Sequence, residues 1–332
     1  MHIPRFQNKI NKFYAKVDKT LLPRLARRFK LTQSYKKKLA KLAYPPEYLQ
    51  IDITAYCNLK CKMCPQSIEG GILEKGTMNF SVYKKVLDSG VVAGVFNVLL
   101  VLTGEPLLHK QLIEMIRYAK SKGLKVNIST NCTLLTPSMS EALIKSGLDE
   151  ILLSFDTVKK ELYEDYRRGA KFEQVLNNIL TFLEIRKKIK SRKPFPTMAN
   201  LQKFNPNIPK LQIEEDFWEV FGKYDIWIVP KYFSNWSGIM KTEKELYRES
   251  EIGTHSQYQL CRTIYQRIVV SWDGKVLSCC NDFLRQQIMG DALEQSITEI
   301  WNGPAFVNLR QKLANKEYNK LPLCKNCGVL WK

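Results

Sequence analysis

Residues 48–65 read YLQIDITAYCNLKCKMCP, a short apolar strand followed at once by three closely spaced cysteines. The apolar half has the composition of a buried β-strand. In the second half, Cys57, Cys61 and Cys64 can wrap one face of an iron–sulfur cube and leave its fourth iron open. Zinc is the alternative, but zinc sites take four protein ligands, and no fourth ligand lies nearby in sequence. The pattern favours an iron–sulfur cluster after the first strand.

This first strand, predicted over residues 48–54, begins a regular alternation of strands and helices. Further strands are predicted over residues 95–102, 125–130, 150–155, 197–201 and 224–229. Apolar residues recur at helical spacing between them, as in Leu112, Ile113, Ile116 and Ala119 and in Val175, Leu176, Ile179 and Leu183. Such alternation predicts a parallel sheet with right-handed crossovers. The predicted fold class is α/β, a partial (β/α)6 barrel over residues 48–235.

The cysteine count adds a second constraint. The chain has no apolar run of membrane-spanning length and no signal-peptide core, so we expect a cytoplasmic protein. Disulfides are rare in that compartment, so nine cysteines indicate metal centres instead. Cys132 stands alone and is expected to be a small buried apolar residue.

Polar segments follow the next three predicted strands. They read Thr103-Gly104-Glu105-Pro106, Ser129-Thr130-Asn131-Cys132 and Ser154-Phe155-Asp156, and Arg167-Arg168-Gly169 comes shortly after the last. Parallel barrels gather their chemistry at the carboxyl ends of their strands, so these segments are expected to share one site. Taken singly, Ser154 also fits a helix cap, and either arginine also fits a solvated helix charge.

Together these segments resemble the radical S-adenosylmethionine (SAM) superfamily. Its signature is Cys-x3-Cys-x2-Cys after a first strand, and the later segments resemble its Gly-Gly-Glu-Pro, Thr-Asn-Gly and Ser-x-Asp motifs. The resemblance implies bound SAM and a SAM-binding [4Fe-4S] cluster on Cys57, Cys61 and Cys64. It also implies that Glu105 and its neighbour Gly104 meet the SAM amino group. The other implied SAM contacts are Ser129, Asn131, Ser154, Arg167 and Arg168, with Ser154 and one arginine near the ribose and carboxylate.

A second cysteine group lies in the last quarter of the chain. It consists of Cys261, Cys279, Cys324 and Cys327, enough to ligate one [4Fe-4S] cluster. A predicted hairpin of residues 267–271 and 275–278 folds Cys279 back toward Cys261. A structural zinc site with four thiolates is the alternative. A helix is predicted over residues 296–301.

This tail resembles the SPASM/Twitch class of C-terminal modules. The resemblance rests on residues 274–282, 288–291 and 300–301 and on the Cys324-x2-Cys327 pair. Too few cysteines are present for the two clusters of a full SPASM module, so it implies one auxiliary [4Fe-4S] cluster. The module is expected to be a small α+β unit over residues 236–332. Cys280 is expected to pack, with a ligand exchange for Cys279 as the second interpretation.

The chain of 332 residues has a formal net charge of +20, and residues 1–47 form a basic, helix-prone extension. On one helical face lie Leu21, Leu22, Leu25 and Phe29. We expect this face to cap the barrel, and peripheral contact of residues 1–44 with an anionic membrane is the alternative. No nucleic-acid-binding module is recognisable, so no specific nucleic acid is expected.

The resemblance implies reductive SAM cleavage and hydrogen abstraction from a small-molecule substrate, with a flavodoxin- or ferredoxin-type reductant. The auxiliary cluster most simply accepts an electron from the substrate. This favours a dehydrogenase-type oxidoreductase acting on a secondary alcohol of a sugar or cyclitol derivative. The basic charge permits an anionic or sugar-linked substrate. Radical modification of a ribosomally made peptide is the second interpretation, and an iron–sulfur electron-transfer or scaffold protein is the non-enzyme one.

Overall fold

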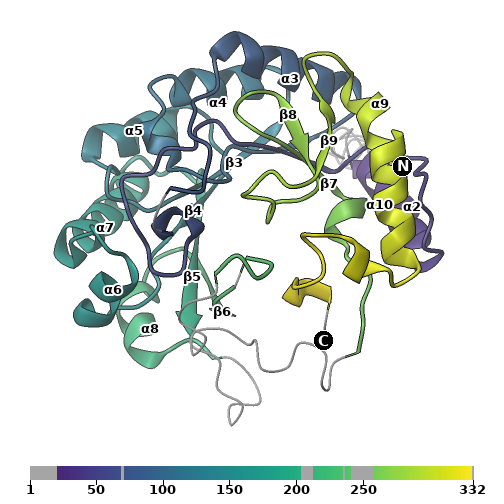
Figure 1. Cartoon of the computed structure of the whole chain (residues 1–332). Coiled ribbons are helices and arrows are strands. Elements are labelled where there is room, and N and C mark those ends of the chain that lie inside the picture. The colour runs from purple at the N-terminus through teal and green to yellow at the C-terminus, as the bar shows by residue number, and fades with distance from the viewer. Residues whose placement is uncertain (1–20, 69–70, 203–211, 235, 241–256, 331–332) are drawn as a thin grey trace, which may run out of the picture.

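The computed structural model describes residues 21–68, 71–202, 212–234, 236–240 and 257–330. Its centre is a nine-stranded sheet of order β6-β5-β4-β3-β2-β1-β7-β8-β9. Six consecutive parallel strands form an open, curved wall with helices outside it (Figure 1). These strands are β1 (Tyr48–Ile51), β2 (Asn97–Leu99), β3 (Lys125–Thr130), β4 (Glu150–Leu153), β5 (Phe195–Gln202) and β6 (Trp227–Tyr232). The predicted partial barrel is confirmed.

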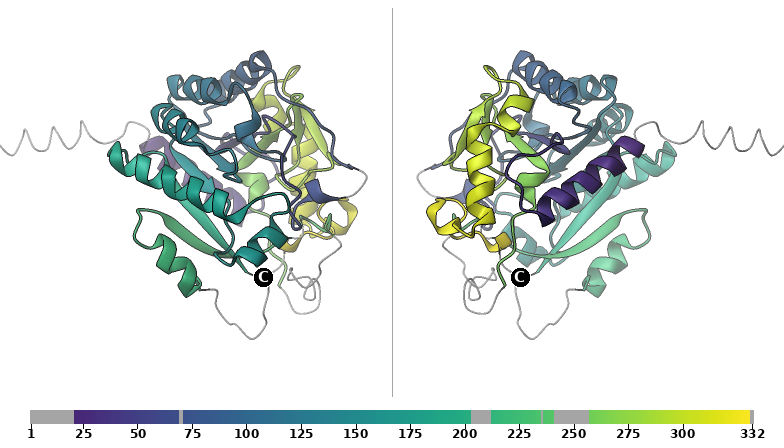
Figure 2. Two further views of the ribbon diagram at one scale, coloured as in Figure 1. Left: turned by 90° about the vertical axis from the view of Figure 1, so that its left-hand side faces the viewer. Right: turned by 90° about the vertical axis from the view of Figure 1, so that its right-hand side faces the viewer.

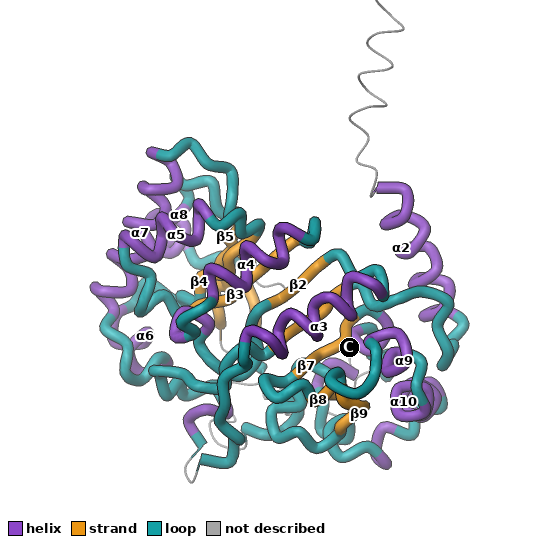
Figure 3. Tube along the Cα trace, turned by 90° about the horizontal axis from the view of Figure 1, so that it is seen from above, coloured by secondary structure: helices purple, strands orange, loops and turns teal. Residues whose placement is uncertain are grey.

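The helices alternate with these strands and cover their outer face, and Figure 3 shows α3 and α4 lying over the strands. Their starts are encoded locally: Asn79 caps α3, and Thr136 caps α5 just before a proline at its first position. The helices are α3 (Phe80–Val92), α4 (Leu112–Ser121), α5 (Pro137–Lys145), α6 (Lys160–Tyr166), α7 (Phe172–Lys188) and α8 (Glu215–Phe221). The predicted faces of α4 and α7 pack inward, although Ile113 and Leu176 are only partly buried. Met115 and Phe182 are also buried on these helices.

The sixth strand differs most from its prediction, because it begins and ends three residues later than expected and includes Pro230. A proline cannot donate a ladder hydrogen bond, so it is excluded from central strands. β6 is the edge strand of the sheet, where that missing donor costs nothing.

The C-terminal module continues the barrel sheet. β7 (Arg267–Val270) pairs in parallel with β1, and β8 (Lys275–Leu277) returns antiparallel to β7, as the predicted hairpin requires. A third strand, β9 (Ile288–Asp291), was not predicted. The predicted helix is present as α9 (Ile297–Trp301), which begins with a Ser296–Glu299 capping box, and α10 (Pro304–Ala314) follows.

The N-terminal helix α2 (Leu21–Lys36) does pack against the barrel, but through a different face from the one predicted. Arg27 donates to the carbonyls of Gly94 at 2.5 Å and Pro46 at 3.3 Å, and Leu31 is buried. Leu25 and Phe29, which were expected to make the contact, are 52% and 66% exposed. Arg27 follows Leu25 by two residues, and Leu31 follows Phe29 by two. Two residues correspond to about 200° of rotation around a helix, so the observed contact face is opposite to the predicted one.

The remainder of the N-terminal extension ties α2 to the C-terminal module. The Tyr35 hydroxyl donates to the Leu260 carbonyl at 2.6 Å, and the Trp301 indole donates to the Tyr44 carbonyl at 2.9 Å. Figure 2 shows α2 and α10 on the same side of the molecule. Residues 1–20 and the side chains of Leu21 and Leu22 lie outside the described part of the chain. None of the described helices is long and apolar enough to cross a membrane.

This anchoring predicts different roles for two neighbouring arginines. Arg27→Ala should lower the free energy of unfolding by about 1–3 kcal/mol, since it removes two hydrogen bonds and the stacking of the guanidinium on Phe96. Arg28→Ala, at an exposed position of the same helix, should change it by less than about 0.5 kcal/mol. Denaturant unfolding of both variants measures this, and equal losses would contradict the packing.

Candidate functional site

A cavity of about 320 Å³ opens at the carboxyl ends of the six parallel strands, where the chemistry was expected. The structure brings together all of the predicted barrel residues except one. Those lining the cavity are Cys57, Cys61, Cys64, Gly104, Glu105, Ser129, Asn131, Ser154 and Arg167. The exception, Arg168, has an exposed side chain and offers only its carbonyl, which accepts from the Lys60 amide at 3.0 Å.

The three-cysteine loop is held by its backbone. The Lys62 amide donates to the Tyr166 carbonyl at 2.8 Å, and the Cys64 amide donates to the Cys61 carbonyl at 2.9 Å. Burial raises the pKa of the Cys57 and Cys61 thiols and raises that of Cys64 to about 12. Neutral thiols are cheap to bury, and iron would displace their protons on binding. Three free thiols on one loop, facing one cavity, fit the predicted cluster.

The Gly104–Glu105 segment is pressed against the backbone that leads into this loop. A Cβ atom on Gly104 would lie 2.2 Å from the Thr54 carbonyl oxygen and 2.4 Å from that of Tyr56. Only glycine fits such an approach. The Glu105 amide then donates to the Tyr56 carbonyl at 2.9 Å, which brings Glu105 beside Cys57.

The Glu105 carboxylate is buried and strongly hydrogen-bonded. It accepts from the Thr130 hydroxyl at 2.7 Å, the Asn131 amide at 2.7 Å and the Leu107 amide at 3.0 Å. Burial raises its pKa, and these donors oppose that shift. A buried carboxylate oriented in this way suits a ligand ammonium group.

The ends of β3 and β4 supply the next polar groups. Asn131 donates to the Asn58 side chain at 2.9 Å, and the same nitrogen lies 3.9 Å from the Cys57 sulfur. The hydroxyls of Ser129 and Ser154 lie 3.3 Å apart on adjacent strands. They are therefore placed to bind neighbouring polar atoms of one ligand.

Arg167 is fixed by a bidentate ion pair with Asp156. Its Nε and Nη2 atoms lie 2.6 Å and 2.7 Å from the two carboxylate oxygens. Asp156 is buried and ends the Ser-x-Asp segment, so two of the three guanidinium nitrogens are engaged by it. The pair holds a positive charge on the cavity wall with a defined orientation.

The second cysteine group also converges. Burial raises the pKa of the Cys261, Cys279 and Cys324 thiols, and Cys327 raises each of them further. Cys327 is therefore within electrostatic range of the other three thiols, although 65 residues lie between the first and the last of the four. Cys280 acts on Cys279 more strongly than the other cysteines do, so both interpretations of Cys280 stay open.

Asp282 has a structural role at this site. Its carboxylate accepts from the Gln286 amide at 2.8 Å and from the Gln287 amide at 3.0 Å, which caps the loop after Cys279. Burial raises the pKa of its carboxyl group. Cys132 is fully buried, as expected of a packing residue.

Several residues of the cavity were not predicted. Lys231 is the penultimate residue of β6, and the strand-end rule applied to that strand would have found it. Trp236 and Phe283 also line the cavity and meet edge to face with ring centroids 4.7 Å apart, and no sequence signal pairs them. Asp52 explains the threonine in the Gly-Gly-Glu-Pro-like segment, because it accepts from the Thr103 hydroxyl at 2.5 Å. Burial raises the pKa of Asp52 to about 7.

Comparisons with known proteins agree with this geometry. The model of the radical SAM superfamily matches residues 51–192, and that of the SPASM iron–sulfur cluster-binding domain matches residues 261–328. A tungsten-containing aldehyde ferredoxin oxidoreductase cofactor-modifying protein of Pyrococcus furiosus is 25% identical over 322 residues, which cover 85% of this chain and 87% of that protein. A GTP 3',8-cyclase of Clostridium acetobutylicum is 33% identical, but over only 42% of this chain and 44% of the cyclase.

Two solved structures share the fold. BtrN in complex with AdoMet and 2-DOIA superposes with a TM-score of 0.57 at 21% identity, covering 85% of this chain and 92% of BtrN. Streptococcus suis SuiB bound to its precursor peptide SuiA gives 0.63 at 19% identity, covering 92% of this chain and 74% of SuiB.

Residues 51–192 thus belong to the radical SAM superfamily, the class that the partial barrel and the three-cysteine loop define. Residues 261–328 add an SPASM domain, so the protein is a radical SAM enzyme with an iron–sulfur C-terminal module. Its cofactors are a SAM-binding [4Fe-4S] cluster, SAM itself and an auxiliary cluster.

The position of Glu105 yields a direct test of the SAM contact. Glu105→Gln should weaken SAM binding about tenfold or more, because the charge-assisted hydrogen bond to the SAM amino group is lost. Iron content should stay at the wild-type level. Glu114→Gln, on the exposed face of α4, is the matched control. Equilibrium binding of SAM to reconstituted protein measures both, and unchanged affinity in Glu105→Gln would refute the contact.

Proposed function

We propose that this protein oxidises a secondary alcohol of a small sugar or cyclitol derivative, with the auxiliary cluster as electron acceptor. One observation carries the proposal: the loop that follows Cys279 reaches the SAM cavity. Phe283 lines the cavity together with Cys57, Cys61 and Cys64, and it lies four residues after Cys279. A cluster held by Cys279 and its partner cysteines would therefore be connected to the cavity wall by a short stretch of chain.

The reaction balances as a two-electron oxidation. Bound SAM with its cluster would supply the species that takes one hydrogen atom from the carbinol carbon, and the auxiliary cluster would take up the remaining electron. Loss of the hydroxyl proton to a base completes the change of the alcohol to a ketone. The residues of this chain bind and orient the two reactants. Glu105, Ser154 and Arg167 hold SAM, and the Trp236–Phe283 wall excludes water from the substrate side.

Lys231 bears on the class of substrate. Lys231 lines the cavity near the end of β6, and its side chain is exposed. The other charged groups lining the cavity are already hydrogen-bonded within the described chain, Glu105 by three donors and Arg167 by Asp156. A substrate with a phosphate or carboxylate group would complement this lysine.

Solved neighbours with both kinds of bound substrate share this fold. This chain covers 92% of BtrN, whose structure contains 2-DOIA, and 90% of anSMEcpe, whose structure contains the Cp18Cys peptide. Peptide modification is therefore the second candidate, and the superposition on peptide-bound SuiB has the higher TM-score of 0.63. A scaffold or electron-transfer protein would not need the buried Glu105 and the Arg167–Asp156 pair.

The proposed electron path predicts a specific defect in Cys324→Ala/Cys327→Ala. Iron content should fall from about eight to about four atoms per chain, with the SAM cluster retained. Incubated with SAM and a panel of C-deuterated sugars and cyclitols, this variant should still move deuterium into 5′-deoxyadenosine but form little ketone. Lys325→Ala, an exposed position between the two cysteines, is the control and should keep both the auxiliary cluster and the ketone yield. Full ketone yield without the auxiliary cluster would contradict the electron-acceptor role.

We also propose a flavodoxin- or ferredoxin-type reductant and a peripheral contact of α2 with anionic membranes. Leu25 and Phe29 lie one turn apart and are exposed, and Arg28 and Lys30 beside them are exposed as well. An exposed apolar pair among basic residues suits an anionic lipid surface.

The membrane contact predicts that Leu25→Glu/Phe29→Glu abolishes binding to vesicles containing phosphatidylglycerol. Wild-type binding should weaken as salt rises, because the attraction is partly electrostatic. Lys187→Ala/Lys188→Ala, exposed on α7, lowers the net charge by the same two units and is the control. Cosedimentation measures both, and equal binding by the two double variants would rule out α2 as the contact.

A further inference from the structure

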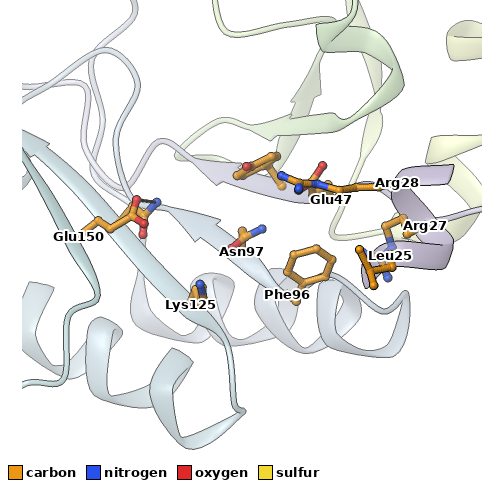
Figure 4. Close-up of a pocket in the computed structure, with 10 residues that line it drawn as sticks. Leu25, Arg27, Arg28, Glu47, Phe96, Asn97, Lys125 and Glu150 are labelled. Atoms are coloured by element: carbon orange, nitrogen blue, oxygen red, sulfur yellow. Dashed lines mark hydrogen bonds between the residues drawn. The ribbon is translucent and has the colours of Figure 1, made fainter. Parts of the chain in front are cut away.

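A second cavity, of about 270 Å³, lies at the amino-terminal ends of the strands, opposite the SAM site. The first residues of neighbouring strands meet there, because Tyr48 pairs with Asn97, and Asn97 pairs with Lys125. Arg27 and Arg28 of α2 close one side. Figure 4 shows Asn97 in the middle of this pocket, between Glu47 and Lys125.

The interior of this pocket contains polar groups that lack partners. Glu47 and Asn97 are each 8% exposed, and neither side chain makes a hydrogen bond or ion pair with any residue that the structure describes. The Oδ1 atom of Asn127 is also buried without a partner, while its Nδ2 donates to Glu150 at 2.8 Å. Unpartnered buried polar groups cost folding free energy, and a buried carboxylate costs the most. A strand-start position does not need them, since apolar residues would pack there equally well.

The arrangement of charge selects one class of ligand. The Glu47 carboxylate and the Asn97 side-chain oxygen are acceptors on the pocket wall, so they match a donor with positive charge. At the mouth, Arg28 and Lys125 are exposed cations, and neither has a partner among the described residues. They match a carboxylate. A cavity of this volume is below the range for drug-sized ligands and suits a small metabolite.

We propose that this pocket binds a small amino acid as its zwitterion. The ammonium group lies inside, against the side chains of Glu47 and Asn97, and the carboxylate faces Arg28 and Lys125. The side chain of the ligand lies toward Phe96 and Leu25, which also line the pocket. The site is separate from the SAM cavity, since the two cavities share no lining residue.

Calorimetry of the full-length reconstituted protein tests this with L-alanine as the probe. We expect saturable binding of L-alanine, and none of acetate or methylammonium at the same concentrations, because each offers only half of the zwitterion. Binding should persist with saturating SAM present. Glu47→Gln and, separately, Lys125→Met should each weaken it about tenfold or more, the effect of losing one charge-assisted hydrogen bond. The controls Glu219→Gln and Lys187→Met, exposed and remote from the pocket, should bind normally.

Any of four results would overturn the site. These are no saturable binding of L-alanine, equal binding of methylammonium, displacement by SAM, and unchanged affinity in both pocket variants. Displacement by SAM would move the amino acid to the Glu105 cavity instead. Lys125 lies on the exposed rim of the pocket, so Lys125→Met keeps the test decisive even where Glu47→Gln lowers stability.

Discussion

The parallel ladders of β1, with β2 on one side and β7 on the other, are the constraint on which the rest of the structure depends. The loop with the three cysteines leaves the carboxyl end of β1, and β7 leads through its hairpin to Cys279. The positions of the three-cysteine loop and of Cys279 are therefore both set by β1, directly in the first case and through its pairing with β7 in the second. Because barrel and module share a continuous sheet, the loop after Cys279 can reach the cavity and contribute Phe283 to its wall.

The second element of this design is the close approach at Gly104. The segment after β2 touches the backbone of the β1 end so closely that a side chain is excluded. Asp52, buried on β1, holds the same segment through Thr103. These contacts bring Glu105 to the three-cysteine loop before any ligand arrives, so the site is organised by the fold. Preorganised polar groups of this kind bind a charged ligand without having to reorder.

Much of this could be predicted from the sequence, because the signals are local. Apolar strands, helix caps and Cys-x3-Cys-x2-Cys are each encoded within a few residues, and the strand-end rule then brings Glu105, Asn131 and Ser154 together. The resemblance to the radical SAM superfamily assigned their roles. It could not separate Arg167 from Arg168, since only the fold directs Arg167 toward Asp156.

The features that the sequence did not predict depend on long-range packing. The register of β1 with β7 joins residues more than 200 apart, and no local pattern specifies it. The predicted orientation of α2 was wrong, because hydrophobicity favoured Leu25 and Phe29 as the contact residues. The observed contact is made by Arg27, which donates to two backbone carbonyls. A long polar side chain with an apolar stem can pack as effectively as leucine when its donors are satisfied.

The central claim is that the three-cysteine loop and the Glu105 segment form a working SAM-cleaving site. Its most direct test is to incubate chemically reduced, reconstituted protein with SAM under anaerobic conditions and to quantify methionine and 5′-deoxyadenosine. The account predicts equal amounts of both from the wild-type protein, and neither from the variant in which Cys57, Cys61 and Cys64 are all alanine. A reduced, iron-loaded wild-type protein that leaves SAM intact would contradict it.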